Sequence, residues 1–296
     1  MIRSLLASDD APGRPVLRYH GGKFRAARRL VALMPPHRTY VEPYMGAASV
    51  LLAKPPAYSE VINDLDGEVV NLFRVLRDPL LALRLKAALE LTPFARAEFE
   101  ASHLPARGRV ERARRMVVRS FMGFGSAASN AAHVTGFRAD SKKSGTTPAH
   151  DWAHYPEALA AFTARLAGVV IESRDARRVI ASHDGPETLH FVDPPYVLST
   201  RRVRLRNAAY RHDMTDADHV DLAQSLHAAT GMVLLCGYEG PLYDTLYKNW
   251  ERLQYRAWAD GAQARTECVW FNPAAWERQA QGTLLLPTLE GEFADE

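Results

Sequence analysis

Short apolar runs that alternate with helical patterns constrain the fold of this chain more than any other feature of its sequence. The runs are rich in β-branched and aromatic residues and cover 39–44, 58–63, 168–172, 188–192, 231–237 and 266–271. Helical patterns such as EVVNLFRVLRD, EALAAFTARLAG and DADHVDLAQSLHAAT lie between them. This alternation predicts an α/β fold with a parallel sheet whose strands are joined by helical crossovers.

Two segments depart from this alternation. Residues 78–165 are first helical in pattern and then small and polar, in the stretch MGFGSAASNAAHVTGFRADSKKSGTTPAHD. Long irregular stretches inside a compact enzyme are usually functional or disordered. We therefore expect 78–165 to be a helical insertion with a mobile loop, and 1–77 and 166–290 to form the sheet-containing domain. Residues 291–296 are expected to be a loosely held acidic tail.

The positive charge of the chain is concentrated in two clusters. Residues 107–119 hold six arginines against one acid, and residues 201–212 hold five arginines and no acid. The remaining chain has 26 basic and 33 acidic residues, although the net charge of the whole chain is +3. This distribution predicts a surface for a polyanion, while the first cluster could equally be a solvated helix face.

Several protein classes are not indicated. MIRSLLASDD contains only a three-residue apolar run, too short for a signal peptide, and no stretch approaches the length of a membrane span. Cys236 and Cys268 both lie in apolar, strand-like runs, which favours buried thiols and a cytoplasmic location over a disulfide framework. No His and Cys cluster has the spacing of metal ligands, so no metal is expected.

The stretch HFVDPPYV at 190–197 ends an apolar strand in a carboxylate, two prolines and a tyrosine. Ligands of open parallel sheets bind at the carboxyl ends of the strands. Two prolines stiffen the chain after Asp193 and offer no N–H, so the Asp193 carboxylate and the Pro194 carbonyl form a corner of acceptors. Such a corner can accept both hydrogens of a base's exocyclic amine while Tyr196 stacks on the base. A strand that ends in a turn with an N-capping aspartate, without any catalytic role, would have a similar sequence.

Two further segments place polar groups at the same sheet edge. YVEPYMGAASVLL at 40–52 reads as a strand, a glycine turn and a helix start, which can hold a carboxylate or phosphate. Asp64 ends the next strand, 18 residues after Gly46, close to where a dinucleotide fold places its ribose-binding acid. A complete G-x-G-x-x-G motif is absent, which argues against nicotinamide binding.

RYHGGK (18–23), VEPYMGAAS (41–49), INDLD (62–66) and FVDPPY (191–196) occur in this order, with the long insertion before the last. With the carboxyl-terminal CGYEGPLYDTLY and RTECVWFNP, they make the chain resemble the Dam-like family of DNA adenine-N6 methyltransferases. The similarity in motif order and spacing covers nearly the whole chain. It implies a Rossmann-like S-adenosylmethionine-dependent methyltransferase sheet with an inserted helical target-recognition domain.

The resemblance also implies the site. S-adenosylmethionine would be the methyl donor, and an adenine of double-stranded DNA would be flipped out into the pocket. The catalytic residues would be Asp193, Pro194, Pro195 and Tyr196. The cofactor-binding residues would be Tyr19, Gly22, Lys23, Glu42, Pro43, Tyr44, Gly46, Asp64, Asp175 and Asp193. Among these, Asp64 would hold the ribose hydroxyls and Asp175 would lie beside the cofactor adenine.

One turn departs from the family pattern F-x-G-x-G, because Tyr44 replaces its phenylalanine and Ala48 replaces its second glycine. A methyl group at position 48 fits if that residue is already helical. We therefore expect the affinity for the cofactor to be modestly altered and not lost.

The arginine clusters are predicted to bind DNA. Arg201, Arg202 and Arg206 begin five residues after Tyr196, so we expect them to contact phosphates around the flipped nucleotide, with Tyr210 nearby. Base reading is expected from the insertion, where Arg115 and Arg119 lie one helical turn apart and Asn130 lies in the polar loop. The alternative is that this loop is only a linker.

Two rival functions stay open from the sequence. Cytosine-N4 methylation uses the same amine chemistry, and a catalytically silent DNA-binding protein could retain the fold. A cognate restriction endonuclease is a conceivable partner, no membrane is expected, and either a monomer or a dimer fits the sequence.

Overall fold

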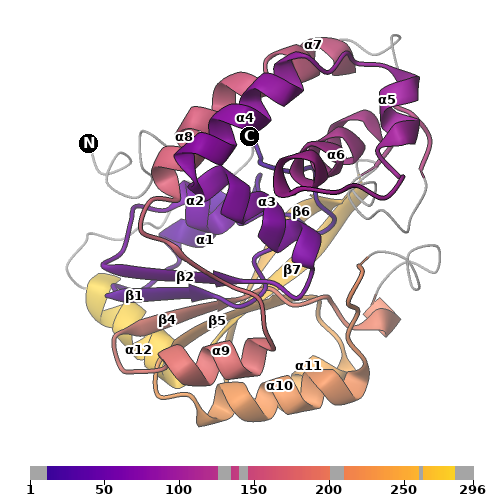
Figure 1. Cartoon of the computed structure of the whole chain (residues 1–296). Coiled ribbons are helices and arrows are strands. Elements are labelled where there is room, and N and C mark those ends of the chain that lie inside the picture. The colour runs from indigo at the N-terminus through magenta and orange to yellow at the C-terminus, as the bar shows by residue number, and fades with distance from the viewer. Residues whose placement is uncertain (1–11, 126–134, 140–145, 201–209, 260–262, 284–296) are drawn as a thin grey trace.

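The computed structural model describes residues 12–125, 135–139, 146–200, 210–259 and 263–283. Within these residues, seven strands form one sheet in the order β3-β2-β1-β4-β5-β7-β6, with helices on both faces (Figure 1). The predicted α/β fold is therefore confirmed. The loop expected in the insertion falls largely on 126–134 and 140–145, outside the described residues, as does the tail at 291–296.

The strands match the six apolar runs of the sequence and add one more. Their bounds are β1 Thr39–Glu42, β2 Ser59–Asn63, β3 Val170–Glu172, β4 Thr188–Val192, β5 Met232–Gly237, β6 Glu251–Ala259 and β7 Gln263–Phe271. The pairs among β1 to β5 are parallel, but β7 runs antiparallel to both β5 and β6. The prediction of a parallel sheet thus holds for the first five strands only. β6 was missed because ERLQYRAWA interleaves charged and apolar residues, as an edge strand does.

The strand order reverses at β1. Val41 of β1 pairs with Val61 of β2 on one side and with His190 of β4 on the other. Connections leave this point in opposite directions, which opens a crevice beyond the carboxyl ends of the strands. The residues that end or follow these strands, Glu42 and Asp193 among them, therefore lie at one edge of the sheet.

Two hydrophobic clusters fill the two sides of the sheet. The larger one joins inward side chains of the strands to α1 (Ala27–Ala32), α2 (Ser49–Ala53) and α3 (Gly67–Arg77). The other joins the opposite face to α9 (Ala176–His183), α10 (Asp216–Ala228) and α11 (Pro241–Leu246). The last helix, α12 (Pro273–Thr283), contributes Ala275 to the larger cluster.

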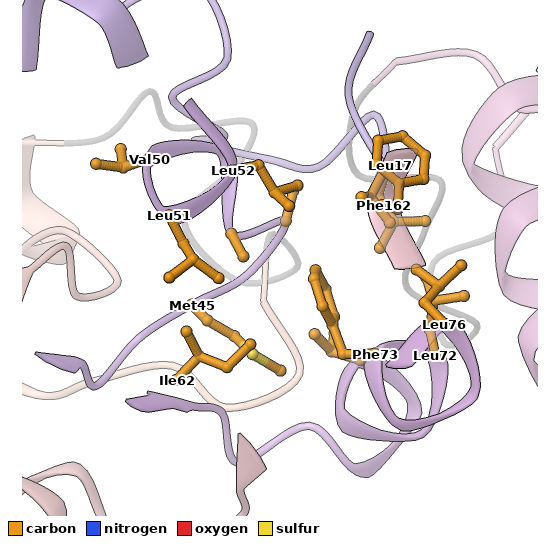
Figure 2. Packing of buried hydrophobic residues seen from close by; sticks show 14 of the residues in the cluster. Leu17, Met45, Val50, Leu51, Leu52, Ile62, Leu72, Phe73, Leu76 and Phe162 are labelled. Carbon is orange, nitrogen blue, oxygen red and sulfur yellow. The ribbon is translucent and has the colours of Figure 1, made fainter. Parts of the chain in front are cut away.

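The described part of residues 78–165, the segment predicted to be an insertion and called the insertion below, is mostly helical. Its elements are α4 (Pro79–Glu90), α5 (Arg96–Ala101), α6 (Arg109–Met122), α7 (Pro148–Ala153), the 3-10 turn η2 (Pro156–Ala158) and α8 (Leu159–Arg165). Figure 2 shows Phe162 of α8 near Leu17 and close to Leu76 of α3, and all three belong to the larger cluster. The insertion thus packs on the sheet domain through a shared core. None of the described helices is long and apolar enough to cross a membrane.

Local sequence explains several helix starts. Asp66 accepts the backbone N–H of Glu68 at the start of α3, and Asp78 caps α4 immediately before a proline. Thr215 and Asp218 form a reciprocal capping box at the start of α10, which was expected to be an ordinary helix start. A second 3-10 turn, η3 (Leu198–Thr200), follows the proline pair of β4.

Candidate active site at the carboxyl edge of the sheet

An open pocket lies at the carboxyl ends of β1, β2 and β4. The space between its lining residues, open solvent included, is about 1160 Å³. All ten residues predicted to bind the cofactor line it: Tyr19, Gly22, Lys23, Glu42, Pro43, Tyr44, Gly46, Asp64, Asp175 and Asp193. The structure therefore brings together segments that lie far apart in the sequence.

Gly46 shapes the floor of this pocket. Its φ of 46° is in the left-handed region, and a Cβ at this position would lie 2.9 Å from Cε1 of Tyr19. Its backbone N–H donates to Oδ2 of Asp64 at 3.0 Å, and Oδ1 of Asp64 accepts the N–H of Asp66 at 2.8 Å. The turn after β1 thus fixes the carboxylate that ends β2. Burial raises the pKa of Asp64 to about 6.

Ala48 does not have the helical conformation expected from the sequence. It precedes α2 with φ 47° and ψ 35°, in the left-handed region, and it is fully buried. A residue with a Cβ is strained there, by roughly 1–2 kcal/mol, which explains why a glycine would be easier at this position. Ala47 and Ser49 line the pocket, but Ala48 does not. The Ala48 methyl group therefore faces the core and not the ligand space.

Glu42 is a buried carboxyl group at the end of β1. Its Oε2 accepts hydrogen bonds from Tyr40 Oη at 3.0 Å and from the N–H of Leu51 at 3.2 Å. Burial raises the pKa of Glu42 to about 8, and the nearby carboxylate of Asp193 adds to the rise. At neutral pH this group is mostly protonated.

Asp193 forms a buried ion pair with Lys23. The Lys23 Nζ lies 2.9 Å from Asp193 Oδ2, donates to the Gly21 carbonyl at 2.9 Å, and lies 4.9 Å from the centre of the Tyr196 ring. Oδ1 of Asp193 makes no hydrogen bond of good geometry with the described residues. Burial raises the pKa of Asp193, and the ammonium of Lys23 opposes this rise. One carboxylate oxygen is therefore anchored by Lys23, and the Tyr196 hydroxyl interacts with the same carboxylate and lowers its pKa.

The remaining members of the tetrad surround this pair. Pro195 lines the pocket with Asp193, whereas Pro194 and Tyr196 lie behind the lining. The Tyr196 side chain is 9% exposed and packs edge-on against Tyr238 at 4.7 Å between ring centres. The aromatic ring that the sequence suggested would be presented to a base is thus mostly covered by protein.

Asp175 lies on the far wall, at the start of α9. Its carboxylate caps the helix through the N–H of Arg177 and forms an ion pair with the Arg177 guanidinium at 3.0 Å. Hydrogen bonding by Arg177 holds the pKa of Asp175 below its usual range.

Tyr210, predicted to lie near DNA around the flipped nucleotide, lines the same pocket. Its hydroxyl donates to the His20 carbonyl at 3.3 Å, and a Cβ on Gly21 would lie only 2.4 Å from it. Arg211, the next residue, pairs with Asp66 at 3.2 Å. The segment that leads into α10 is therefore part of the pocket wall.

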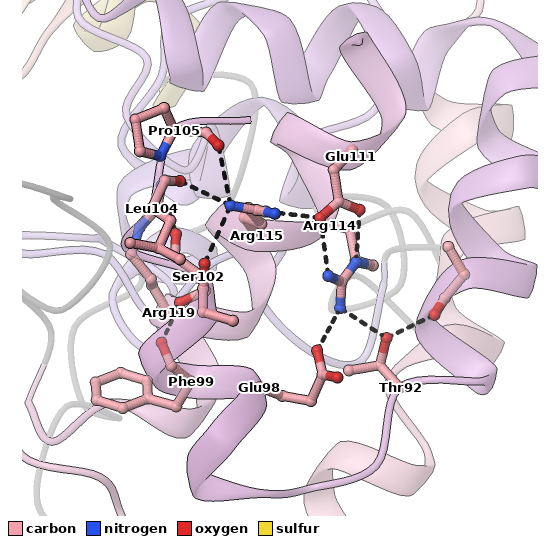
Figure 3. A network of polar contacts seen from close by, with 12 residues as sticks. Thr92, Glu98, Phe99, Ser102, Leu104, Pro105, Glu111, Arg114, Arg115 and Arg119 are labelled. Atoms are coloured by element: carbon pink, nitrogen blue, oxygen red, sulfur yellow. Dashed lines mark hydrogen bonds and ion pairs between the residues drawn. The ribbon is translucent and has the colours of Figure 1, made fainter. Parts of the chain in front are cut away.

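Arg115 and Arg119 do not point towards solvent (Figure 3). Nη1 of Arg115 donates to the carbonyls of Ala101, Leu104 and Pro105, and its Nε donates to Glu111 at 2.6 Å. Arg119 is 4% exposed and donates to the Ser102 carbonyl. This geometry argues against the prediction that the two arginines read bases, because internal contacts already occupy them.

Four further DNA-binding predictions, at Asn130, Arg201, Arg202 and Arg206, lie outside the described residues. The sequence analysis assigned no role to several pocket residues, among them Ser49, Asp66, Arg211 and His212, although Ser49 and Asp66 end the motifs VEPYMGAAS and INDLD. Asp66 also carried a local signal, since an aspartate before a helical pattern is a helix start. Within the described residues, no group of three His, Cys, Asp or Glu side chains could hold a metal ion.

A comparison with protein families gives one match. The model of the family described as D12 class N6 adenine-specific DNA methyltransferase matches residues 19–257, which include every pocket segment described above. A comparison with curated proteins gives no match.

Proposed function

The chain belongs to the D12 class N6 adenine-specific DNA methyltransferase family, and on this premise we propose that Asp193, Pro194 and Tyr196 hold the target adenine. Members of this class use S-adenosylmethionine to methylate the N6 amine of adenine in DNA. The chain is accordingly an S-adenosylmethionine-dependent DNA methyltransferase. The observation that carries the residue assignment is the Asp193 carboxylate, anchored by Lys23 through one oxygen and facing the pocket.

The pocket suits the cofactor on three counts. Its lining holds seven Asp or Glu side chains against three Lys or Arg, which favours a positively charged ligand. The buried Oγ of Ser49 has no hydrogen-bond partner among the described residues and can receive one from a ligand. The absence of a Cβ at Gly46 lets the ring of Tyr19 lie against the turn, where both residues line the pocket.

S-adenosylmethionine, when bound, would supply a methyl group on a sulfonium sulfur, which would leave as a neutral thioether while the amine nitrogen gains the methyl group and loses one proton. In our proposal Oδ1 of Asp193 and the Pro194 carbonyl accept the two amine hydrogens, which frees the lone pair of the nitrogen. Lys23 fixes the Asp193 carboxylate through Oδ2. Tyr196 braces Lys23 from the other side and borders the base.

Other pocket residues are assigned to the cofactor. We assign the ribose hydroxyls to Asp64, because each of its oxygens already accepts one backbone N–H and has a second lone pair free. Asp175 is assigned to the side of the cofactor adenine, where it lines the pocket wall. Tyr19, Gly22, Glu42, Pro43 and Tyr44 complete the enclosure.

The DNA side of the proposal rests on sequence. We propose that Arg201, Arg202 and Arg206 contact phosphates and that a loop containing Asn130 contributes to base reading. Base flipping, a cytoplasmic location, a cognate restriction endonuclease and the choice between monomer and dimer belong to this proposal too. Two free, buried cysteines, Cys236 and Cys268, are consistent with the location.

The variant Asp193→Ala tests the proposal. It should reduce methyl transfer to DNA by at least about 10²–10³-fold in protein that is still folded by circular dichroism, with a lower unfolding midpoint because the buried Lys23 loses its partner. Transfer of labelled methyl groups is the measurement, and nucleoside analysis of the product distinguishes N6-methyladenine from N4-methylcytosine. Retained turnover would refute the role of Asp193. Absence of cofactor binding to the wild type by calorimetry would support the catalytically silent alternative.

A further inference from the structure

A second carboxylate, that of Glu267, lies near the group formed by Lys23, Asp193 and Tyr196, which is called the catalytic corner below. Glu267 of β7 is directly opposite Tyr255 of β6 in the strand register. Tyr255 Oη donates a hydrogen bond of 2.7 Å to Oε2 of Glu267. The hydroxyl therefore holds the carboxylate in one orientation, although neither residue belongs to the pocket lining.

The register places Glu267 on the same face of the sheet as the catalytic pair. Cys236 of β5 pairs with Val269 of β7, and both side chains belong to the larger hydrophobic cluster. Glu267 is two residues from Val269, so its side chain leaves the same face. Phe191 is also in this cluster, and Asp193 follows it by two residues. Asp193 and Glu267 thus flank Cys236 on one face.

The electrostatics agree with this placement. Burial lowers the pKa of Lys23, but the carboxylates of Asp193 and Glu267 outweigh burial, and its pKa is raised overall. Glu267 also contributes to the raised pKa values of Asp193 and Tyr196, after burial in both cases. The charge of Glu267 therefore raises the pKa values of all three residues, Lys23, Asp193 and Tyr196.

The charges of this corner do not cancel. With Glu267 it contains one ammonium, Lys23, and two carboxylates, Asp193 and Glu267, while Glu42 is mostly protonated at neutral pH because its pKa is about 8. Burial raises the pKa values of Cys236 and Tyr255, which face the same corner, so both remain neutral. The net charge of these buried groups is thus −1, while the exposed Arg29 lies 5.7 Å from the centre of the Tyr255 ring. One positive charge on a ligand would balance the buried groups.

We propose that Glu267 is a positioning residue whose charge balances the sulfonium of the methyl donor and adds to the charge of Asp193 around Lys23. This inference rests on the proposed function. With Glu267 present, Lys23 does not neutralise Asp193 completely, so Oδ1 of Asp193 keeps its strength as an acceptor for the target amine. The same net charge suits the transfer itself, because the positive charge passes from sulfur to nitrogen within the corner.

The variant Glu267→Gln tests this role with two ligands that differ in charge. S-adenosylmethionine carries the sulfonium, whereas S-adenosylhomocysteine has a neutral sulfur at the same place. Calorimetry on the full chain should show that the variant weakens S-adenosylmethionine on the order of tenfold more than S-adenosylhomocysteine. The matched control Glu251→Gln removes an exposed carboxylate from β6 and should leave the ratio of the two dissociation constants unchanged.

Two more variants separate charge from hydrogen bonding. Glu267→Asp and Tyr255→Phe both keep the carboxylate charge, so both should retain most of the wild-type ratio. The proposal is overturned if Glu267→Gln weakens both ligands equally or neither, or, should that variant fail to fold, if the two charge-retaining variants lose the ratio. Failure of the proposed function looks different, because the wild type would then bind neither ligand.

Discussion

The pocket and the arginines of α6 are both rich in charged side chains, but they differ in how those side chains are satisfied. Arg114 donates to Glu111, Glu98 and Thr92, and Arg115 donates to Glu111 and to three backbone carbonyls (Figure 3). These groups are occupied within the fold. In the pocket, by contrast, Asp193 Oδ1 and Ser49 Oγ are buried without a hydrogen bond of good geometry among the described residues.

This difference distinguishes charged side chains that stabilise the fold from charged and polar side chains that can bind a ligand. A buried polar atom without a partner costs about 1–3 kcal/mol, and a bound ligand can satisfy the two in the pocket, whereas Nε of Arg119 on α6 is buried away from the pocket. A substitution in the pocket should therefore change ligand binding, whereas one in the arginine network should change the free energy of unfolding. Both regions contain a glycine with positive φ, which allows the first and largest effect to be compared directly.

Gly46→Ala should reduce the affinity for S-adenosylmethionine on the order of 100-fold or more. The new Cβ would have a left-handed φ and would lie 2.9 Å from the ring of Tyr19, which must then move into the ligand space. Gly108→Ala is the matched control at the start of α6, since its φ is 81° but no atom lies within 4 Å of the new Cβ. Calorimetry should show near-normal binding for this control. Equal losses of affinity in both variants would mean that the strain of a left-handed backbone, and not the contact with Tyr19, weakens cofactor binding.

Arg115→Ala should lower the free energy of unfolding by about 1–3 kcal/mol, because three carbonyls lose their donor and Glu111 keeps only Arg114. Urea unfolding measures this change. The set of methylated sequences should stay the same, as judged by sequencing DNA treated with the variant. Normal stability combined with relaxed sequence preference would instead restore the original prediction that Arg115 reads bases.

How far the sequence predicts the molecule depends on whether the deciding contacts are local. Asp64 and Asp193 were placed correctly at the pocket because each ends an apolar strand, a property of its own neighbours in the sequence. Arg115 was interpreted as a base reader from its spacing to Arg119 on one helix. Its partners Leu104 and Pro105 belong to a loop that packs back on α6, and these contacts are not visible in the helical spacing. The hydrophobic periodicity of the sequence does not predict that this loop packs against α6.

Glu267 and the position of Tyr210 escaped prediction for the same reason. The ionic relation of Glu267 to Lys23 depends on how β7 is ordered in the sheet, and this strand runs against the predicted parallel direction. Tyr210 enters the pocket wall through its contact with the His20 carbonyl, 190 residues away in the sequence. The left-handed conformation of Ala48 was likewise hidden, because its residue type argues against it.

Cofactor affinity should fall as the pH drops below about 6, the pKa of Asp64. The carboxylate is the form that accepts ribose hydroxyls, and protonation of a group whose pKa is raised removes that acceptor already in mild acid. The apparent dissociation constant should therefore rise roughly tenfold between pH 7 and pH 5. Calorimetry over this range measures the change, and Asp64→Asn should bind weakly with a flat profile. A steep profile in this variant would assign the titration to another pocket group.

Ala48→Gly should have the smallest effect and should affect stability more than binding. Glycine adopts a φ of 47° without a Cβ penalty, so the free energy of unfolding should rise by roughly 1 kcal/mol, offset in part by the greater entropy of glycine in the unfolded chain. The residue is buried outside the pocket lining, so the affinity for S-adenosylmethionine should change less than threefold, an amount worth about 0.6 kcal/mol. Urea unfolding and calorimetry on the same preparation separate the two quantities. A large gain in affinity with unchanged stability would mean that the strain of Ala48 acts on the cofactor site. The contrast between the pocket and α6 would then concern the backbone beneath the pocket as well as hydrogen bonding of side chains.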